Sequence, residues 1–286
     1  METFSWNQIK AAGEQPSARQ GHSISFFPKT RKLLLFGGLD ASGAVVKDKA
    51  YFLTVPNDIT DRWHWQPVRF AGLSRTIGGI MVDRAFHSTS DIGNEKVVVF
   101  GGICDEITSK HHSSMLFQCD TTSFSCHEPK VYGEGPCSRY AHSSCSLESG
   151  ANGREVIIIG GMKSDTREIL SDGYVLEVHP TAVRWSKISF HGDLLANFSV
   201  AFHSISPVTA GLMAQGNILL FGGKSEKNKK CSSLLSLFPS THNYSAVSSP
   251  TLLARVRTAK DVNGNKFSTR QDFLRQRQDR EKMAKG

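Results

Sequence analysis

Residues 97–102 read Val97-Val98-Val99-Phe100-Gly101-Gly102, an uninterrupted apolar run that ends in two glycines. A β-branched apolar run of this length is too short for a helix and is typical of a strand buried on both faces. Two glycines directly after it favour a sharp turn, because glycine has no Cβ and adopts positive φ freely. The stretch therefore predicts a buried strand that turns where packed layers crowd together.

The same arrangement occurs three more times, where the apolar runs 33–36, 156–159 and 218–221 each precede a glycine pair. The four pairs are Gly37-Gly38, Gly101-Gly102, Gly160-Gly161 and Gly222-Gly223. Their first glycines are 64, 59 and 62 residues apart (101−37, 160−101, 222−160). Such a period is too long for a helical-hairpin repeat and suits a blade of four short strands. The sequence therefore predicts an all-β fold, a β-propeller.

Other residues repeat in register with the glycines. A histidine-serine dipeptide lies upstream of each pair, at His22-Ser23, His87-Ser88, His142-Ser143 and His203-Ser204. An arginine precedes the first three histidines by three residues, at Arg19, Arg84 and Arg139, whereas the fourth unit has Val200. Downstream of each pair comes a further apolar strand, at 50–53, 115–117, 174–176 and 234–237. An aromatic residue follows it, namely Trp63 or Trp65, Phe124, Trp185 and Tyr244.

This order resembles the kelch repeat, a propeller blade with a double glycine after an apolar strand and aromatic residues further on, and the resemblance covers about residues 1–245. It implies four blades of four antiparallel strands over residues 1–249, followed by a basic extension over 250–286. We interpret the repeated glycines and histidines as structural marks. Propeller symmetry would spread His22, His87, His142 and His203 around the ring, where each would hydrogen-bond to nearby backbone.

Ring closure has two interpretations, because four blades are at the lower end of the usual range of about four to eight. In one, a strand at Trp6 completes the fourth blade. In the other, residues near Tyr244 complete that blade, and the partial ring is completed by another protein or another copy of the chain. An unclosed ring would expose strand edges, which are association surfaces.

The positive charge is concentrated after the repeats. The chain has 34 Lys+Arg against 26 Asp+Glu, a net charge of +8, and residues 250–286 hold ten of these basic residues and four of the acids, or +6. Residues 268–283 read as a short capped helix or a disordered tail. A basic segment of this kind can dock onto an acidic protein or a cytoskeletal polymer. Nucleic acid is not expected as a partner, because no recognised binding motif occurs.

The sequence predicts no metal, no cofactor and no catalytic residue. Five of the six cysteines lie between 104 and 145, but without the CxxC spacing of a zinc site, so we expect reduced cysteines that act as small apolar side chains. The alternative is an enzyme or a metal-dependent specifier-type protein of the galactose-oxidase and kelch superfamily. Its iron motif is approached only by Glu168 and Asp172, which are followed by Leu176 in place of histidine.

The kelch resemblance implies protein binding through loops on one face of the propeller. In related adaptors, arginines at the start of the first strand bind acidic peptides, and Arg19, Arg84 and Arg139 match that position here. The structural alternative is that these arginines bond to neighbouring loop carbonyls. We expect an adaptor or scaffold subunit of a larger intracellular assembly, without a BTB or F-box module. A cytoplasmic location is the simplest expectation, because no signal peptide or membrane span is recognised, and the nucleus, a cilium or the cytoskeleton stay open.

Overall fold

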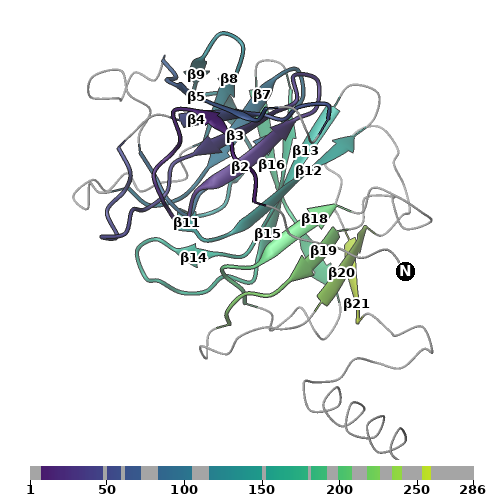
Figure 1. The fold of residues 1–286 in the computed structure, drawn as a ribbon. Helices are drawn as coiled ribbons and strands as arrows, with labels where there is room; N and C mark the ends of the chain where they lie inside the picture. Colours follow the sequence, from purple (N-terminus) through teal and green to yellow (C-terminus); the bar gives the residue numbers. More distant parts are fainter. Residues whose placement is uncertain are drawn as a thin grey trace, which may run out of the picture.

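A computed structural model describes residues 8–47, 50–58, 62–71, 83–104, 116–149, 153–179, 182–191, 199–207, 218–225, 234–239 and 253–258. Every regular element in these ranges is a β-strand, and the strands form four sheets and one two-stranded ribbon (Figure 1). Each sheet contains one Gly-Gly unit. The predicted all-β fold with four blades is therefore confirmed.

The first two blades are built in the predicted order. The first consists of β2 (Ser23–Phe27), β3 (Lys32–Phe36), β4 (Ala50–Thr54) and β5 (His64–Val68), all antiparallel, with β1 (Ala12–Gly13) parallel to β5. The second consists of β6 (Ser88–Asp91), β7 (Lys96–Phe100), β8 (Leu116–Asp120) and β9 (Ser125–His127). In both, the His-Ser dipeptide opens the first strand and the glycine pair follows the second.

The third and fourth blades repeat the pattern. The third consists of β12 (Ser143–Ser149), β13 (Gly153–Ile159), β15 (Gly173–Val178) and β16 (Ala182–Lys187), with β10 (Lys130–Tyr132) parallel to β16. The fourth consists of β18 (Ser204–Pro207), β19 (Ile218–Phe221), β20 (Leu234–Pro239) and β21 (Leu253–Thr258), with β17 (Ser189–His191) parallel to β21. The ribbon pairs β11 (Arg139–Tyr140) with β14 (Met162–Lys163).

Among the described residues, the strand that completes the fourth blade is β21, which the sequence did not predict. The strands beside β20 are β19 and β21, and the outer neighbour of β21 is β17. Trp6 and Tyr244 lie outside the described residues. Because β21 begins at Leu253, the fourth sheet extends beyond residue 249, where we ended the propeller. Residues 259–286, with the predicted short helix, lie outside the described residues.

In three of the four blades, a short strand outside the last strand was not predicted. β1, β10 and β17 precede the His-Ser strand of their own blade and run parallel to its last strand. Gly13 and Gly133 lie there with positive φ, and a Cβ on either would overlap the carbonyl oxygen of Trp65 or Trp185. Both glycines stand in a Gly-Glu-x-Pro sequence, a repeat that could have revealed these segments.

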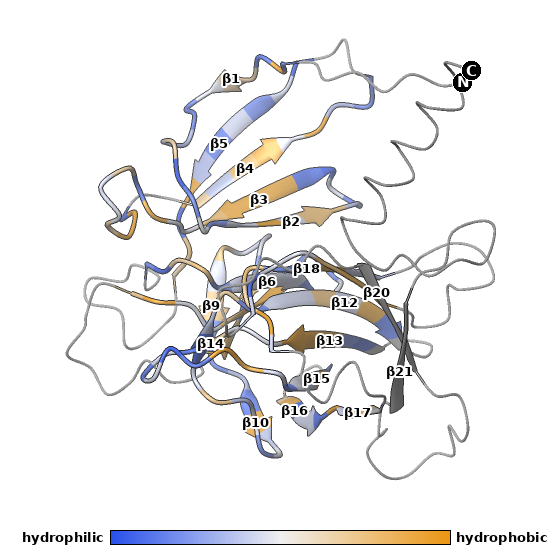
Figure 2. Ribbon diagram, turned by 90° about the horizontal axis from the view of Figure 1, so that it is seen from below, coloured by the Kyte–Doolittle hydropathy of each residue, from blue (hydrophilic) through white to orange (hydrophobic). Residues whose placement is uncertain are grey.

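The core lies between blades. The first strands β2, β6, β12 and β18 contact one another in succession, and three separate apolar clusters join the first blade to the second, the second to the third and the third to the fourth. In Figure 2 the apolar parts of the middle strands β3 and β13 are orange, the colour of hydrophobic residues, and their side chains supply these clusters. The apolar runs of the middle strands thus bury one face against each neighbouring blade.

The prediction that the cysteines are reduced is wrong for one pair. Cys119 on β8 and Cys126 on β9 lie opposite each other in antiparallel strands and form a disulfide. Their Cα atoms are 4.1 Å apart although the two residues are seven positions apart in sequence. The strand register, which the spacing alone does not give, is what brings the two sulfurs together. Among the described residues, Cys104, Cys137 and Cys145 are free thiols.

Candidate interaction surface

The glycine pairs join adjacent blades. The first glycine has φ between +60° and +66° in the first three blades, and a Cβ on it would overlap or crowd the carbonyl oxygen of Arg84, Arg139 or Val200 in the next blade. The second glycine donates its N–H to that same carbonyl, at 2.9, 2.9 and 2.8 Å. Glycine is required at the first position because the chain bends with positive φ against another backbone.

The repeated arginines lie beside these glycines. Arg19, Arg84 and Arg139 each donate from Nη1 to the carbonyl oxygen of the first glycine of their own blade, at 3.3, 2.6 and 3.0 Å. Arg84 and Arg139 are buried and Arg19 is half-buried. Burial lowers the pKa of Arg84 to about 10, which leaves it charged at neutral pH. The structural alternative, an arginine bonded to loop carbonyls, therefore describes all three residues.

Each guanidinium also lies over an aromatic ring of the third strand of its blade. The distances from Cζ to the ring centroid are 5.6 Å for Arg19 and Tyr51, 4.9 Å for Arg84 and Phe117, and 5.5 Å for Arg139 and Tyr174. In the fourth blade Val200 replaces the arginine, and Leu235 takes the register position of the aromatic residue. The two residues change together, as expected when a cation and an aromatic face depend on each other.

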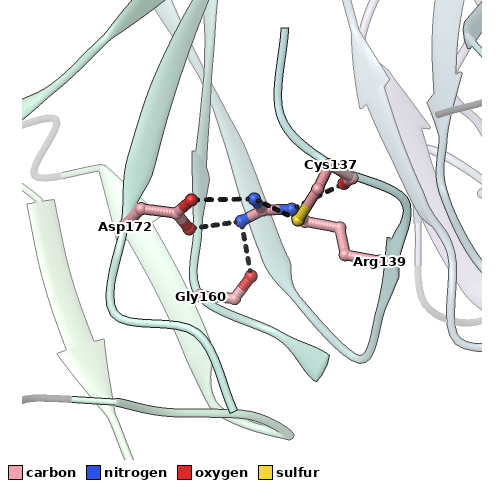
Figure 3. Close-up of polar contacts among 4 residues, drawn as sticks. All are labelled: Cys137, Arg139, Gly160 and Asp172. Carbon is pink, nitrogen blue, oxygen red and sulfur yellow. Dashed lines mark hydrogen bonds and ion pairs between the residues drawn. The ribbon is translucent and has the colours of Figure 1, made fainter. Parts of the chain in front are cut away.

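Arg139 makes the most extensive contacts (Figure 3). Its side chain is fully buried and forms a bidentate pair with Asp172, with Nη1 to Oδ1 at 2.6 Å and Nη2 to Oδ2 at 3.0 Å. Its Nε donates to the carbonyl oxygen of Cys137 at 3.2 Å. Burial acts to lower the pKa of Arg139, but the bonds to Asp172 outweigh it and the pKa is raised. Asp172, which the sequence placed near an incomplete iron motif, is thus a partner of a structural arginine.

These contacts engage the guanidinium groups of Arg84 and Arg139 within the fold. Binding of an acidic peptide by the three arginines stays a prediction, for which the half-buried Arg19 is the most accessible member. The sequence reasoning missed Asp172 as the partner of Arg139, because the two are 33 residues apart and no other blade repeats the pair at matched positions in the sequence.

The repeated histidines link one blade to the next. Nε2 of His87 bonds to Ser23 of the first blade at 2.7 Å, and Nε2 of His142 bonds to Ser88 of the second at 2.8 Å. At the next junction Ser143 donates to the backbone carbonyl of His203 instead. Burial, followed by the field of Arg139, lowers the pKa of His142 to about 3, and burial lowers that of His203 to about 4. These imidazoles are therefore neutral at physiological pH.

The residue before each histidine lies where the four first strands begin. Gly21, Phe86, Ala141 and Phe202 all have positive φ, between 55° and 66°. The ring of Phe86 contacts that of Phe202 edge-on, with centroids 5.6 Å apart, and lies 6.4 Å from that of Tyr140. Phe202 is 49 % exposed. We call Phe86, Tyr140 and Phe202 the aromatic mouth; the sequence did not reveal it because the residue type varies from blade to blade.

Apolar residues from the loops support the aromatic mouth. Leu39, Val45 and Ala85 form one small cluster, Ala141, Ile169 and Ala201 form another, and Phe86 packs against both. The loops that follow the glycine pairs and those that enter the His-Ser strands therefore meet on this side of the molecule. Such a surface, with the exposed ring of Phe202 on a packed base, is suited to holding another polypeptide.

Two further observations concern the described residues as a whole. Within the described ranges, no three or more His, Cys, Asp or Glu side chains are grouped so that they could hold a metal ion. The same part of the chain contains no helix that is long and apolar enough to cross a membrane.

Known proteins resemble this chain in its repeats. It is 23 % identical to acyl-CoA-binding domain-containing protein 4 of Arabidopsis thaliana over 77 % of this chain and 29 % of that protein. It is 29 % identical to Adagio protein 3 of the same plant over 54 % of this chain and 24 % of that protein. It is 25 % identical to host cell factor of Drosophila melanogaster over 77 % of this chain and 14 % of that protein. The chain thus spans less than a third of the length of these relatives.

The family described as the KLHDC2/KLHL20/DRC7 Kelch-repeats domain matches residues 1–208, which include the Gly-Gly marks of the first three blades and the His-Ser mark of the fourth. The blades found in the structure follow the same repeat. The chain therefore belongs to the kelch-repeat family.

Proposed function

We propose that this protein is a protein-interaction subunit, an adaptor or scaffold within a larger intracellular assembly, and that it binds a partner polypeptide at the aromatic mouth. Kelch repeats are generally protein-interaction domains. The observation that carries the proposal is the exposed ring of Phe202, held against Phe86 on a base of packed loop residues. Large aromatic side chains fixed in this way dominate the free energy of many protein interfaces.

The backbone adds to this argument. Phe86 and Phe202 have φ of 56° and 57°, in the left-handed region that bulky residues rarely adopt. Both N–H groups are bonded, to the carbonyl oxygens of Gly21 and Ala141 at 2.7 and 2.9 Å, so the chain holds the two rings in place. Backbone held in a sparsely populated region often belongs to a functional site. A rigid aromatic anchor also costs little conformational entropy on binding.

The basic segment after the fourth blade is a second part of the proposal. We propose that residues 259–286, which hold eight of the ten basic residues counted after 249, contact an acidic surface of the partner or of a cytoskeletal polymer. The proposal places the protein in the cytoplasm and includes no catalytic step and no cofactor.

The test compares partner binding by the full-length protein and by Phe202→Asn. Asparagine adopts positive φ more readily than most residues, so this change should remove the ring without straining the backbone. Partners would be captured by affinity purification and identified by mass spectrometry. The affinity of each partner for the wild type and for Phe202→Asn would then be measured. Loss of an aromatic anchor should weaken binding about 30-fold, equal to about 2 kcal/mol.

The matched control is Val131→Asn on β10, because Val131 is 47 % exposed against 49 % for Phe202 but lies away from the aromatic mouth. It should leave the affinity unchanged. Equal affinity of wild type and Phe202→Asn would refute binding at the mouth. The tail is tested separately with a chain that ends at Thr258, because a shorter chain would lose β21 and disturb the fourth sheet.

A further inference from the structure

The first two junctions between adjacent blades are built from the same side-chain contacts. The residue before the glycine pair packs against the histidine of the next blade, as in Phe36 and His87 with centroids 5.1 Å apart, and Phe100 and His142 at 5.2 Å. The serine after the histidine of the earlier blade bonds to the histidine of the next one, as Ser23 does to His87. Each blade therefore has a trailing face, which contacts the next blade, and a leading face, which contacts the previous one.

The trailing face of the fourth blade is exposed. Phe221, directly before the fourth glycine pair, is 58 % exposed, whereas the matched Phe36, Phe100 and Ile159 are 6 %, 1 % and 4 % exposed. Leu219 on the same face is 37 % exposed, against 2 %, 1 % and 0 % for its counterparts Leu34, Val98 and Ile157. The exposed side chains are as apolar as the buried ones, so this face has the composition of a junction, but no blade of the described residues lies against it.

The leading face of the first blade is exposed along its first strand, whereas Leu35 and Tyr51, on the second and third strands of the same face, are 6 % and 4 % exposed. Ile24 and Phe26 on β2 are 53 % and 45 % exposed, whereas Ile205, which matches Ile24 in the fourth blade, is 8 % exposed. His22 is half-buried, while the histidines that receive a preceding blade, His87 and His142, are 6 % and 7 % exposed. This face thus carries the other half of the junction. Figure 2 shows β2 as the strand of the first sheet nearest the remaining blades.

The backbone also forms a series with two open ends. Phe86 donates its N–H to the carbonyl of Gly21 at 2.7 Å, Ala141 to that of Phe86 at 2.8 Å and Phe202 to that of Ala141 at 2.9 Å. No hydrogen bond between described residues continues the series beyond the carbonyl of Phe202 or before the N–H of Gly21. In the same part of the chain, no apolar cluster joins the fourth blade to the first.

We propose that the trailing face of the fourth blade binds the leading face of the first blade of a second copy of this chain, head to tail. Phe221 of one copy would pack against His22 of the other, and the hydroxyl of Ser204 would bond to the ring of that His22. The exposed apolar side chains Leu219, Ile24 and Phe26 would be buried between them. A second copy is the occupant that the structure favours, because the two faces are the two halves of one junction, whose glycine bond and apolar packing the fold already forms three times.

The test uses the full-length chain and two variants, Phe221→Glu on the trailing face and Ile24→Glu on the leading face. Sedimentation and light scattering would give the mass over a wide range of concentration. The wild type should reach at least twice the chain mass of 31.4 kDa as the concentration rises. Each variant alone should stay at the single-chain mass, because every junction it could form has one charged half.

Mixing the two variants separates this proposal from other modes of association. Each variant keeps one intact face, so an equal mixture should form a two-copy particle. A wild type that stays at 31.4 kDa at every concentration, or a mixture that stays there while the wild type associates, would overturn the proposal. So would variants that associate as the wild type does. Val131→Glu is the control and should associate normally, because Val131 is exposed but lies on neither face.

Thermal unfolding of each variant checks that it is folded, and Leu219→Glu with Phe26→Glu is the replacement pair if either first variant is not. Phe202 is unchanged in all these variants. Failure of self-association can therefore be told apart from failure of partner binding at the aromatic mouth.

Discussion

Substitution of Asp172 by asparagine should destabilise the fold, because it leaves the guanidinium of Arg139 buried without its counter-charge. The change keeps the shape of the side chain and removes only the negative charge. Arg139 has no exposed side-chain surface, and Asp172 is 22 % exposed. Breaking a fully buried ion pair costs about 3–5 kcal/mol. Water at the partly exposed carboxylate and the carbonyl groups of Gly160 and Cys137 should reduce the cost to about 2–3 kcal/mol.

The assay is unfolding in urea and by heat, followed by circular dichroism. A loss of about 2–3 kcal/mol should lower the melting temperature by about 4–12 °C in a domain of this size. The control is Asp165→Asn, because Asp165 is 68 % exposed and lies 3.5 Å from Lys163, so its loss should change stability by less than about 0.5 kcal/mol. If Asp172→Asn destabilises the protein no more than Asp165→Asn, the bidentate pair does not contribute to stability as its burial suggests.

Two further predictions concern the junctions between blades. Gly101→Ala should lower the free energy of unfolding at least twice as much as Gly43→Ala. Both glycines have positive φ, but a Cβ on Gly101 would lie 2.5 Å from the carbonyl oxygen of Arg139, whereas a Cβ on Gly43 would meet open space. Urea unfolding measures both losses, and equal losses would contradict the close approach at Gly101. The free energy of unfolding should fall as the pH drops from 6.5 toward 3. In this range the histidines of the unfolded chain accept protons, whereas His142 in the folded protein, with its pKa of about 3, does not. His142→Gln should reduce this pH dependence by up to about 1.4 kcal/mol per pH unit, as measured by unfolding at a series of pH values, and an unchanged slope would count against a buried neutral imidazole.

The sequence by itself determined the fold and the order of strands, because these depend on local patterns. An apolar run too short for a helix must be a strand, and a glycine pair at a constant period of about 60 residues marks a repeated turn. The structural alternative for the arginines, a bond to neighbouring loop carbonyls, was also stated from the sequence. The structure shows that contact, between each guanidinium and the first glycine carbonyl.

Only the tertiary structure decided which matched residues are buried. Phe100 and Phe221 stand at the same place in their repeats and have the same side chain, yet they are 1 % and 58 % exposed. The difference depends on whether another blade lies beside them, which no local pattern reports. The Arg139 and Asp172 pair, the Cys119–Cys126 disulfide and the strand β21 likewise depend on register and on contacts between distant segments. The periodic sequence pattern determines that a segment forms a strand, whereas the blades that lie beside the strand determine which of its side chains are buried.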